Sequence, residues 1–218
     1  MSWVVMNMFQ QLTKVIWPVS LLCGIDFVAC ENDKITEPQN HLSEIPLTVG
    51  SMWAYSVYDS LDDTSDTVHV EIIGNATLSD GNPSTVWQQY EFKDSTDTLF
   101  VGHSGDTVTF YLDKQYLENQ KVMFILPLQV GNSWGRQYLD TVTVLTKDTV
   151  EVPAGIFFNS YVVQQRSLMP NDLSISKYWI KPYIGIVQMF EVVAVTVAQP
   201  YPQAKNEWEL ISYQIARP

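Results

Sequence analysis

The chain has 218 residues, of which 46% are hydrophobic, 12% aromatic and 17% charged. These values exclude a solvated, disordered chain, which would contain fewer aromatic residues and more charge. The 24 acidic and 12 basic residues give a formal net charge of -12. This excess of acid argues against a nucleic-acid partner, because binding phosphates requires a basic surface.

The N-terminal segment has the features of an export signal. A run of thirteen largely apolar residues, 15–27, follows Lys14, the first basic residue of the chain. That length fits the apolar region of a signal peptide and is short for a membrane-spanning helix. Residues 1–29 are therefore predicted to be a signal peptide. The true start is left open among three methionines: Met1, Met6 and Met8.

The apolar run ends in Phe-Val-Ala-Cys at residues 27–30. A small residue, Ala29, directly before a cysteine resembles the lipobox of bacterial lipoproteins, in which the cysteine is lipidated and becomes the mature N-terminus. We therefore expect lipidation of Cys30 and a polar tether over residues 30–44. A cleaved signal peptide without lipid and an uncleaved anchor helix are the alternatives. The expected location is the bacterial cell envelope, with the outer membrane favoured and the leaflet left open.

Both cysteines, Cys23 and Cys30, lie in this N-terminal segment. The body from Glu31 onward therefore has no disulfide, no thiol nucleophile and no zinc-thiolate cluster. Its 188 residues are enough to bury a substantial hydrophobic core instead. No later segment is apolar enough to predict a second membrane span.

An internal repeat divides the body. The pattern Pro-Leu-x-Val-Gly-x-x-Trp occurs at residues 46–53 and again at 127–134, with five of eight positions identical. Three further pairs of segments run parallel: 67–70 with 141–144, Gly81 with Gly155, and 99–101 with 178–180. Such a repeat is one structural unit that must bury its face against a neighbour. We predict one duplicated domain over 45–218, made of these parts: units at 45–122 and 123–195, and a closing strand near 207–215.

Alternating hydrophobic and polar residues predict β-strands throughout the body. Examples are Val68, Val70 and Ile72 in one segment, and Val108, Phe110 and Leu112 in another. Glycine and proline at the intervening turns reverse the chain. Only the short stretch 114–120 could form a helix. The predicted fold is an all-β, internally duplicated antiparallel sheet domain of ten or so strands, forming a half-open barrel or a sandwich.

Three motifs in this order resemble a family of exported bacterial lipoproteins. They are the Pro-Leu-x-Val-Gly-x-x-Trp pattern, Val-Pro-Ala-Gly-x-Phe at 152–157, and Tyr-Trp-x-x-Pro-x-x-Gly-x-Val at 178–187. The similarity covers residues 45–195. The resemblance implies an exported location and an all-β fold, and it provides no catalytic residues.

Two segments look catalytic at first sight. Residues 131–135 match the Gly-x-Ser-x-Gly nucleophile pattern, but that chemistry needs a strand-to-helix elbow, and a strand-like run follows. Residues 102–106 contain His, Ser and Asp, yet the members of a catalytic triad meet through space rather than as sequence neighbours. We interpret both segments as turns and assign no catalytic residues.

The sequence evidence for a metal site is similarly weak. The chain has only three histidines: His41, His69 and His103. They cannot form a three-histidine zinc site, and no His-Glu-x-x-His spacing occurs. Four clustered carboxylates could provide oxygen ligands for a weak calcium site: Asp59, Asp62, Asp63 and Asp66. Their spacing departs from that of an EF-hand, so a solvated hairpin loop is the preferred interpretation.

The body contains five tryptophans: Trp53, Trp87, Trp134, Trp179 and Trp208. Trp53 and Trp134 hold equivalent positions in the repeat, which predicts equivalent packing sites in a core. An exposed row of aromatic side chains would instead indicate a sugar-binding or ligand-stacking face. The sequence leaves open which aromatic residues face a ligand.

The preferred functional hypothesis is a non-enzymatic binding or assembly module held at a membrane by its N-terminal lipid. Its partner would be an apolar small molecule, a glycan or an envelope protein, and no cofactor or resident metal is expected. One alternative is a carboxylate-dependent hydrolase such as a glycosidase, which needs two carboxylates about 5–9 Å apart across a cleft. The other alternative is a purely structural envelope component.

Overall fold

The computed structural model describes most residues of the segment Gln39–Pro218. The described residues are 44–90, 96–118, 120–136, 140–168, 172–196 and 204–217. The predicted signal peptide, Cys30 and all of the predicted tether except Glu44 lie outside these residues. In the described part of the chain, no helix is long and apolar enough to span a bilayer.

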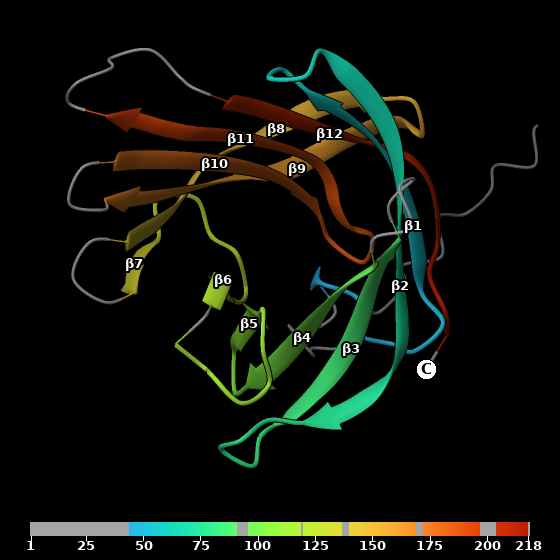
Figure 1. Cartoon of the computed structure of the whole chain (residues 1–218), viewed down its shortest axis with the longest axis vertical. Helices are drawn as coiled ribbons and strands as arrows, with labels where there is room; N and C mark the ends of the chain where they lie inside the picture. The colour runs from blue at the N-terminus through green and yellow to red at the C-terminus, as the bar shows by residue number, and fades with distance from the viewer. Residues whose placement is uncertain are drawn as a thin grey trace, which may run out of the picture. The chain divides into compact units, whose positions relative to one another are not determined.

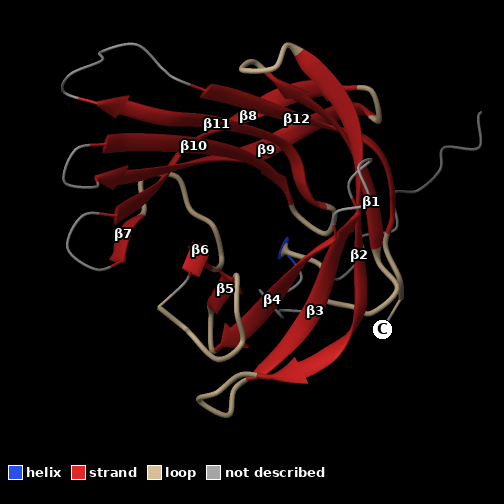
Figure 2. Ribbon diagram, viewed as in Figure 1, coloured by secondary structure: helices blue, strands red, loops and turns tan. Residues whose placement is uncertain are grey.

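The described residues form twelve β-strands (Figure 2). Their bounds are β1 Met52–Asp59, β2 Thr64–Thr77, β3 Pro83–Tyr90, β4 Thr96–Ser104, β5 Thr107–Tyr111, β6 Gln120–Ile125, β7 Ser133–Arg136, β8 Asp140–Val152, β9 Gly155–Leu168, β10 Asp172–Lys181, β11 Gly185–Thr196 and β12 Ala204–Gln214. The stretch considered for a helix does not form one in its described part, 114–118, which consists of bends and turns.

All twelve strands belong to one antiparallel sheet, in the order β6-β5-β4-β3-β2-β1-β12-β11-β10-β9-β8-β7. We call β1–β6 the first meander and β7–β12 the second meander. The strands β1 and β12 join the two meanders, whereas β6 and β7 are the edges of the sheet. The sheet curls into a nearly closed, barrel-like form (Figure 1). This confirms the predicted all-β fold and selects the half-open barrel over the sandwich.

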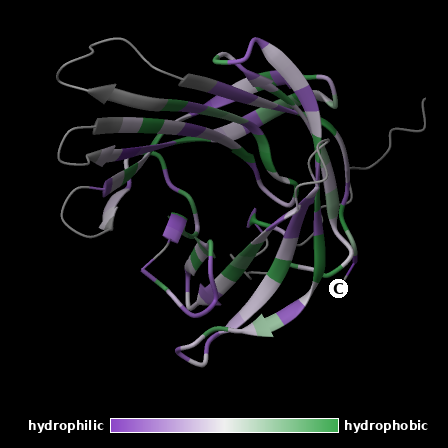
Figure 3. Ribbon diagram, viewed as in Figure 1, coloured by the Kyte–Doolittle hydropathy of each residue, from purple (hydrophilic) through white to green (hydrophobic). Residues whose placement is uncertain are grey.

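Strand β2 shows why these segments form a sheet with one buried face. Val68, Val70 and Ile72 are buried, while His69 and Ile73 between and beyond them are exposed. In a strand, successive side chains point to opposite faces of the sheet, so Val68, Val70 and Ile72 all point inward. Figure 3 shows hydrophobic and hydrophilic bands interspersed along the strands. His69 therefore lies on the outer face of the sheet.

The alternation of buried and exposed side chains extends less far in β5 than the sequence predicts. Val108 and Phe110 are buried as predicted, but the strand ends at Tyr111. Leu112 lies beyond this end and is 57% exposed, so its predicted place on the buried face is wrong. Periodicity alone does not locate the end of a strand, because a loop residue can continue the pattern by coincidence.

The two copies of the Pro-Leu-x-Val-Gly motif make the same backbone hydrogen bonds. The amide of Gly50 donates to the carbonyl of Ile72 at 2.8 Å, and that of Gly131 donates to the carbonyl of Val144 at 2.9 Å. Both glycines have positive φ angles, +89° and +91°, which residues with a Cβ rarely adopt. In each copy a tight turn therefore leads the chain into the first strand of a meander.

The strand register corrects the details of the predicted repeat. Trp53 lies opposite Val70, and Trp134 lies opposite Val142. The equivalent of Val142 is therefore Val70, so the alignment of 67–70 with 141–144 is out of register by two residues. A shift of two keeps every side chain on the same face, so the hydrophobic pattern could not reveal it.

The predicted unit boundaries can be located on the strands. The predicted boundary at 122/123 falls inside β6, Gln120–Ile125. The predicted closing strand near 207–215 lies mainly in β12, Ala204–Gln214, which is the sixth strand of the second meander as β6 is of the first. The described strands thus fall into two sets of six.

Two connecting segments fill part of the interior. Ile45, before β1, and Leu126 and Leu128, between β6 and β7, are all at most 2% exposed. The segments touch, since the backbone amide of Leu128 donates to the carboxylate of Glu44 at 2.8 Å. The amide of Leu126 is fixed separately by the carbonyl of Asp106 at 2.7 Å. These leucine and isoleucine side chains complete the core of the curled sheet.

Candidate functional site

The predicted calcium ligands lie around the turn between β1 and β2 but do not converge. Asp59 accepts a hydrogen bond from the amide of Leu61, and Asp66 accepts one from the amide of Thr67. Among the described residues, no three His, Cys, Asp or Glu side chains lie close enough together to hold a metal ion. Asp59, Asp62, Asp63 and Asp66 are therefore not gathered into a calcium site in this structure.

The Gly-x-Ser-x-Gly segment forms a turn that opens β7, as interpreted from the sequence. The hydroxyl of Ser133 lies 3.1 Å from the carbonyl oxygen of Val142 and 2.9 Å from the hydroxyl of Thr143. The segment that contains His103 and Asp106 is the hairpin turn between β4 and β5. Neither segment has the strand-to-helix elbow that would expose a serine nucleophile.

The five tryptophans divide into two groups. Trp53 and Trp87 are buried, with exposures of 3% and 8%, whereas Trp134, Trp179 and Trp208 are half-buried. Trp53 and Trp134 both donate their indole N–H to a backbone carbonyl, of Ile184 in one case and Met123 in the other. The two motif tryptophans thus share a strand position and a bonding mode, but their burial and their partners differ.

Aromatic rings form a continuous row across the inside of the sheet. Trp53 stacks on Trp87 with 5.0 Å between ring centroids, and Trp87 meets the edge of Phe110 at 5.3 Å. Phe110 contacts Phe124 at 6.1 Å, and Phe124 contacts Tyr178 at 5.7 Å. Edge-to-face pairs in this distance range are individually favourable. Because Phe124 is on β6 and Tyr178 on β10, the row links the two meanders through the interior.

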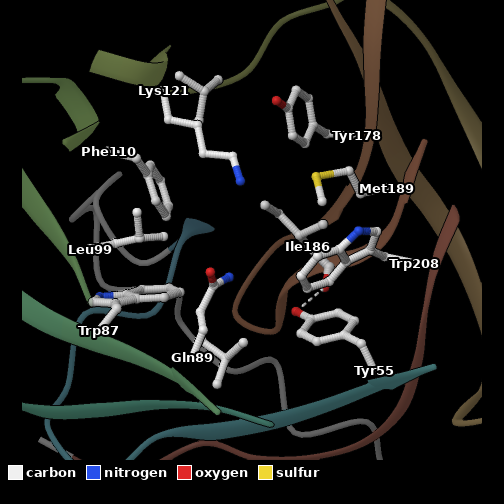
Figure 4. Close-up of a pocket in the computed structure, with 12 residues that line it drawn as sticks. Tyr55, Trp87, Gln89, Leu99, Phe110, Lys121, Tyr178, Ile186, Met189 and Trp208 are labelled. Atoms are coloured by element: carbon white, nitrogen blue, oxygen red, sulfur yellow. Dashed lines mark hydrogen bonds between the residues drawn. The ribbon is translucent and has the colours of Figure 1, made fainter. Parts of the chain in front are cut away.

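A cavity lies against this aromatic row (Figure 4). The centres of water-sized molecules can occupy about 60 Å³ of it. Twelve residues line it: Tyr55, Val70, Trp87, Gln89, Leu99, Phe110, Lys121, Val122, Tyr178, Ile186, Met189 and Trp208. They come from both meanders, so the cavity exists only because the sheet curls.

The lining separates into a buried floor and a half-buried rim. Eight of the lining residues are buried and all eight are apolar or aromatic. The other four are half-buried and form the rim: Gln89, Lys121, Ile186 and Trp208. Apolar cavities with a few polar groups at defined positions are typical of sites for small molecules.

Tyr55 joins the floor to the rim. Its hydroxyl donates to the carbonyl of Ile186 at 2.8 Å, and its ring meets the edge of Trp208 at 5.8 Å. Burial raises the pKa of the Tyr55 phenol well above its ordinary value, because the phenolate would lose its hydration. Tyr55 is therefore a neutral hydrogen-bond donor at physiological pH, and it holds a rim segment of β11 in place.

The lining lacks the groups that the hydrolase alternative needs. None of the twelve residues is Asp, Glu, His, Cys or Ser. A glycosidase site requires two carboxylates facing each other across the cleft that binds the sugar. The chemistry available at this cavity is apolar contact, two tyrosine hydroxyls, a lysine ammonium, an amide and indole N–H groups.

The two edge strands meet beside the cavity. Instead of a backbone ladder, side chains bridge them: the indole of Trp134 on β7 donates to the carbonyl of Met123 on β6 at 3.0 Å. The amide of Gln165 on β9 donates to the carbonyl of Lys121 at 3.2 Å. We call this junction the seam.

Sequence reasoning did not single out the rim residues. Alternation from the buried Val122 and Phe124 would place Lys121 on the outer face of its strand. Lys121 is the one basic residue between Lys114 and Arg136, a signal that the sequence contains but does not place in space. Trp87 and Trp208 were recognised as aromatic residues, but the cavity depends on how two distant strands meet.

The chain matches no protein-family model and no curated protein sequence. Similar solved structures include a candidate lipoprotein from Parabacteroides distasonis, with a TM-score of 0.45 and 10% sequence identity. They also include a candidate exported protein with a YmcC-like fold from Bacteroides fragilis, with a TM-score of 0.47 and 12% identity. Each similarity covers 78% of this chain and 98% of the other. Neither comparison assigns a family or a function to this chain.

Proposed function

We propose that this protein is a non-enzymatic binding module of the bacterial cell envelope that holds a small apolar molecule inside its curled sheet. The observation that carries the proposal is the cavity, whose buried floor is formed entirely by apolar and aromatic side chains. Such a floor offers no group for bond cleavage but removes apolar surface from water, which favours binding by about 25 cal/mol per Å².

The size of the cavity limits the ligand. On the same measure one water molecule needs about 10–15 Å³, so a volume of about 60 Å³ accommodates only a few such molecules. The ligand is therefore compact, with an apolar part the size of a short alkyl chain or one aromatic ring.

The envelope location rests on the N-terminal sequence. The apolar run 15–27 and Ala29 before Cys30 support export followed by lipidation. In this proposal residues 30–44 tether the sheet domain to the membrane, with the outer membrane favoured. An internally duplicated origin of the two meanders is part of the same proposal, and the matching hydrogen bonds of Gly50 and Gly131 support it.

Binding is tested with 1-octanol, an uncharged apolar probe, by titration calorimetry on the full-length protein. Wild-type protein is expected to bind with a negative heat-capacity change, because apolar surface becomes buried. Replacing a rim residue by a larger one, Ile186→Trp, should weaken binding by about tenfold or more, equivalent to about 1.4 kcal/mol. Ile156→Trp is the matched control, because Ile156 is 53% exposed and does not line the cavity.

Absence of any saturable binding of 1-octanol would remove the cavity from the proposal and favour a purely structural component.

The anchor is tested independently by metabolic labelling with a radioactive fatty acid. Wild type and Cys23→Ala should incorporate the label, whereas Cys30→Ala should not. Equal labelling of the two variants would contradict lipidation at Cys30.

A further inference from the structure

The charge at the cavity rim deepens the proposed function, on which this inference rests. Lys121 is the one charged residue among the twelve that line the cavity. Its side chain is half-buried, and it extends into the space between the aromatic residues, with the Gln89 amide approaching from the other side (Figure 4). A cation in this position determines which head group an apolar ligand can carry.

A β-bulge explains why Lys121 points inward. In the register of β5 and β6, Phe110 lies opposite Val122, but the next residue, Tyr111, lies opposite Gln120. Lys121 is therefore the extra residue of the bulge and has no partner on β5. Bulges of this kind turn a side chain that would otherwise alternate to the outer face. The backbone of the bulge is held in place by Gln165, which donates to the carbonyl of Lys121.

Within the described residues, no side chain neutralises this ammonium. Across the described parts of the chain, the Lys121 Nζ makes no hydrogen bond and no ion pair. The rim offers a second free donor, because the buried indole N–H of Trp208 has no acceptor among the described residues. A buried donor without an acceptor is costly, and an incoming acceptor relieves that cost at Trp208.

The net charge of the chain does not override this local charge. The formal charge of -12 creates a negative field around the protein, which would by itself repel an anion. At physiological ionic strength, however, charges more than about 8 Å away are largely screened. An anion in contact with Lys121 is therefore governed by the ammonium, and the lining contains no carboxylate to oppose it.

We infer that the ligand is a compact organic acid whose apolar part lies on the aromatic floor and whose carboxylate pairs with Lys121. One lysine matches one negative charge. A phosphate monoester carries about 1.5 to 2 negative charges at neutral pH and is typically held by several cations or by arginine forks. The lining has neither arginine nor a second lysine, so a monoanionic carboxylate fits it better.

The test uses three probes with the same alkyl chain: octanoate, 1-octanol and octylammonium. Full-length wild-type protein is expected to bind octanoate about tenfold more tightly than 1-octanol, and octylammonium least tightly. Lys121→Met keeps the apolar stem and removes the charge, so octanoate should lose its advantage while the affinity for 1-octanol stays within about twofold. Lys121→Arg, which keeps the charge, should retain the preference for octanoate.

Lys114→Met is the matched control, because Lys114 is exposed and does not line the cavity. It should leave all three affinities unchanged. If wild type binds octanoate and 1-octanol equally, or if Lys121→Met still prefers octanoate, the inference is overturned while the proposed binding function stands. If none of the three probes binds, the proposed function itself fails.

Discussion

The first meander meets the second meander twice, and the two junctions are built differently. At one junction β1 and β12 form a backbone ladder from Met52 opposite Gln214 to Asp59 opposite Asn206. At the seam, β6 and β7 are the edges of the sheet, and side chains connect β6 to the second meander: Trp134 bonds from β7 and Gln165 from β9.

This difference places the functional features on one side of the molecule. The ladder pairs β1 with β12 along the whole of β1, with one register shift between Ala54 and Tyr55, so the β1–β12 junction is suited to holding the meanders together. At the seam, β6 has a backbone partner on one side, β5, and the bulge in that pairing turns Lys121 toward the cavity. We therefore predict that substitutions on the β1–β12 side lower the free energy of unfolding more than substitutions at the seam. Substitutions at the seam should instead alter ligand binding.

The largest expected effect distinguishes the two motif tryptophans. Trp53→Ala should lower the free energy of unfolding by about 3–5 kcal/mol, because this buried ring stacks on Trp87 and bonds to Ile184 on the ladder side. Trp134→Ala at the seam should cost only about 1–2 kcal/mol, since Trp134 is half-buried. Urea unfolding of both variants measures the difference. Equal costs would contradict the contrast between the junctions.

The next largest effect is expected in the free energy of unfolding at alkaline pH. The raised pKa of buried Tyr55 means that above pH 10 the unfolded chain releases the phenol proton while the folded protein keeps it. This contribution to stability is complete below pH 10, and above it the free energy of unfolding falls by up to about 1.4 kcal/mol per pH unit. Tyr55→Phe should remove that part of the slope in unfolding experiments between pH 9 and pH 12.

Tyr58→Phe provides the control for this titration. The pKa of Tyr58 is also raised, mainly by its hydrogen bond to Asp63, but this side chain is exposed. The alkaline slope should therefore change much less in Tyr58→Phe than in Tyr55→Phe. At neutral pH, Tyr55→Phe should cost about 1 kcal/mol, because the carbonyl of Ile186 loses its donor.

The sequence predicted the sheet better than it predicted the site, for a physical reason. Buried strands follow from alternation that is local to each segment, as with Val68, Val70 and Ile72. The bulge at Lys121 depends on how β6 pairs with β5, and alternation within β6 alone predicts the opposite face. Likewise, Trp87 and Trp208 come together only when the sheet curls. The site therefore needed the fold to be known first.

A smaller loss of stability is expected when the hydrogen bond from Gln165 to Lys121 is removed. Gln165→Leu removes the bond to the carbonyl of Lys121 and should cost about 1 kcal/mol. Hydrogen exchange should quicken at the amides of β6 and stay unchanged in β12, since the ladder does not depend on Gln165. Gln188→Leu is the matched control, because Gln188 bonds to Glu209 between β11 and β12, where backbone pairing remains. Faster exchange of β12 in Gln165→Leu would show that the junctions open together.

The smallest expected effect concerns Lys121 itself. Lys121→Met should change the free energy of unfolding by less than about 0.5 kcal/mol, because methionine keeps the apolar stem and the described residues provide no partner for the ammonium to lose. Thermal unfolding without ligand measures this change. A loss above about 1 kcal/mol would mean that the ammonium stabilises the seam, and a structural cation of that kind is not free to pair with a ligand. A near-zero change combined with lost octanoate preference would separate binding from folding at one side chain.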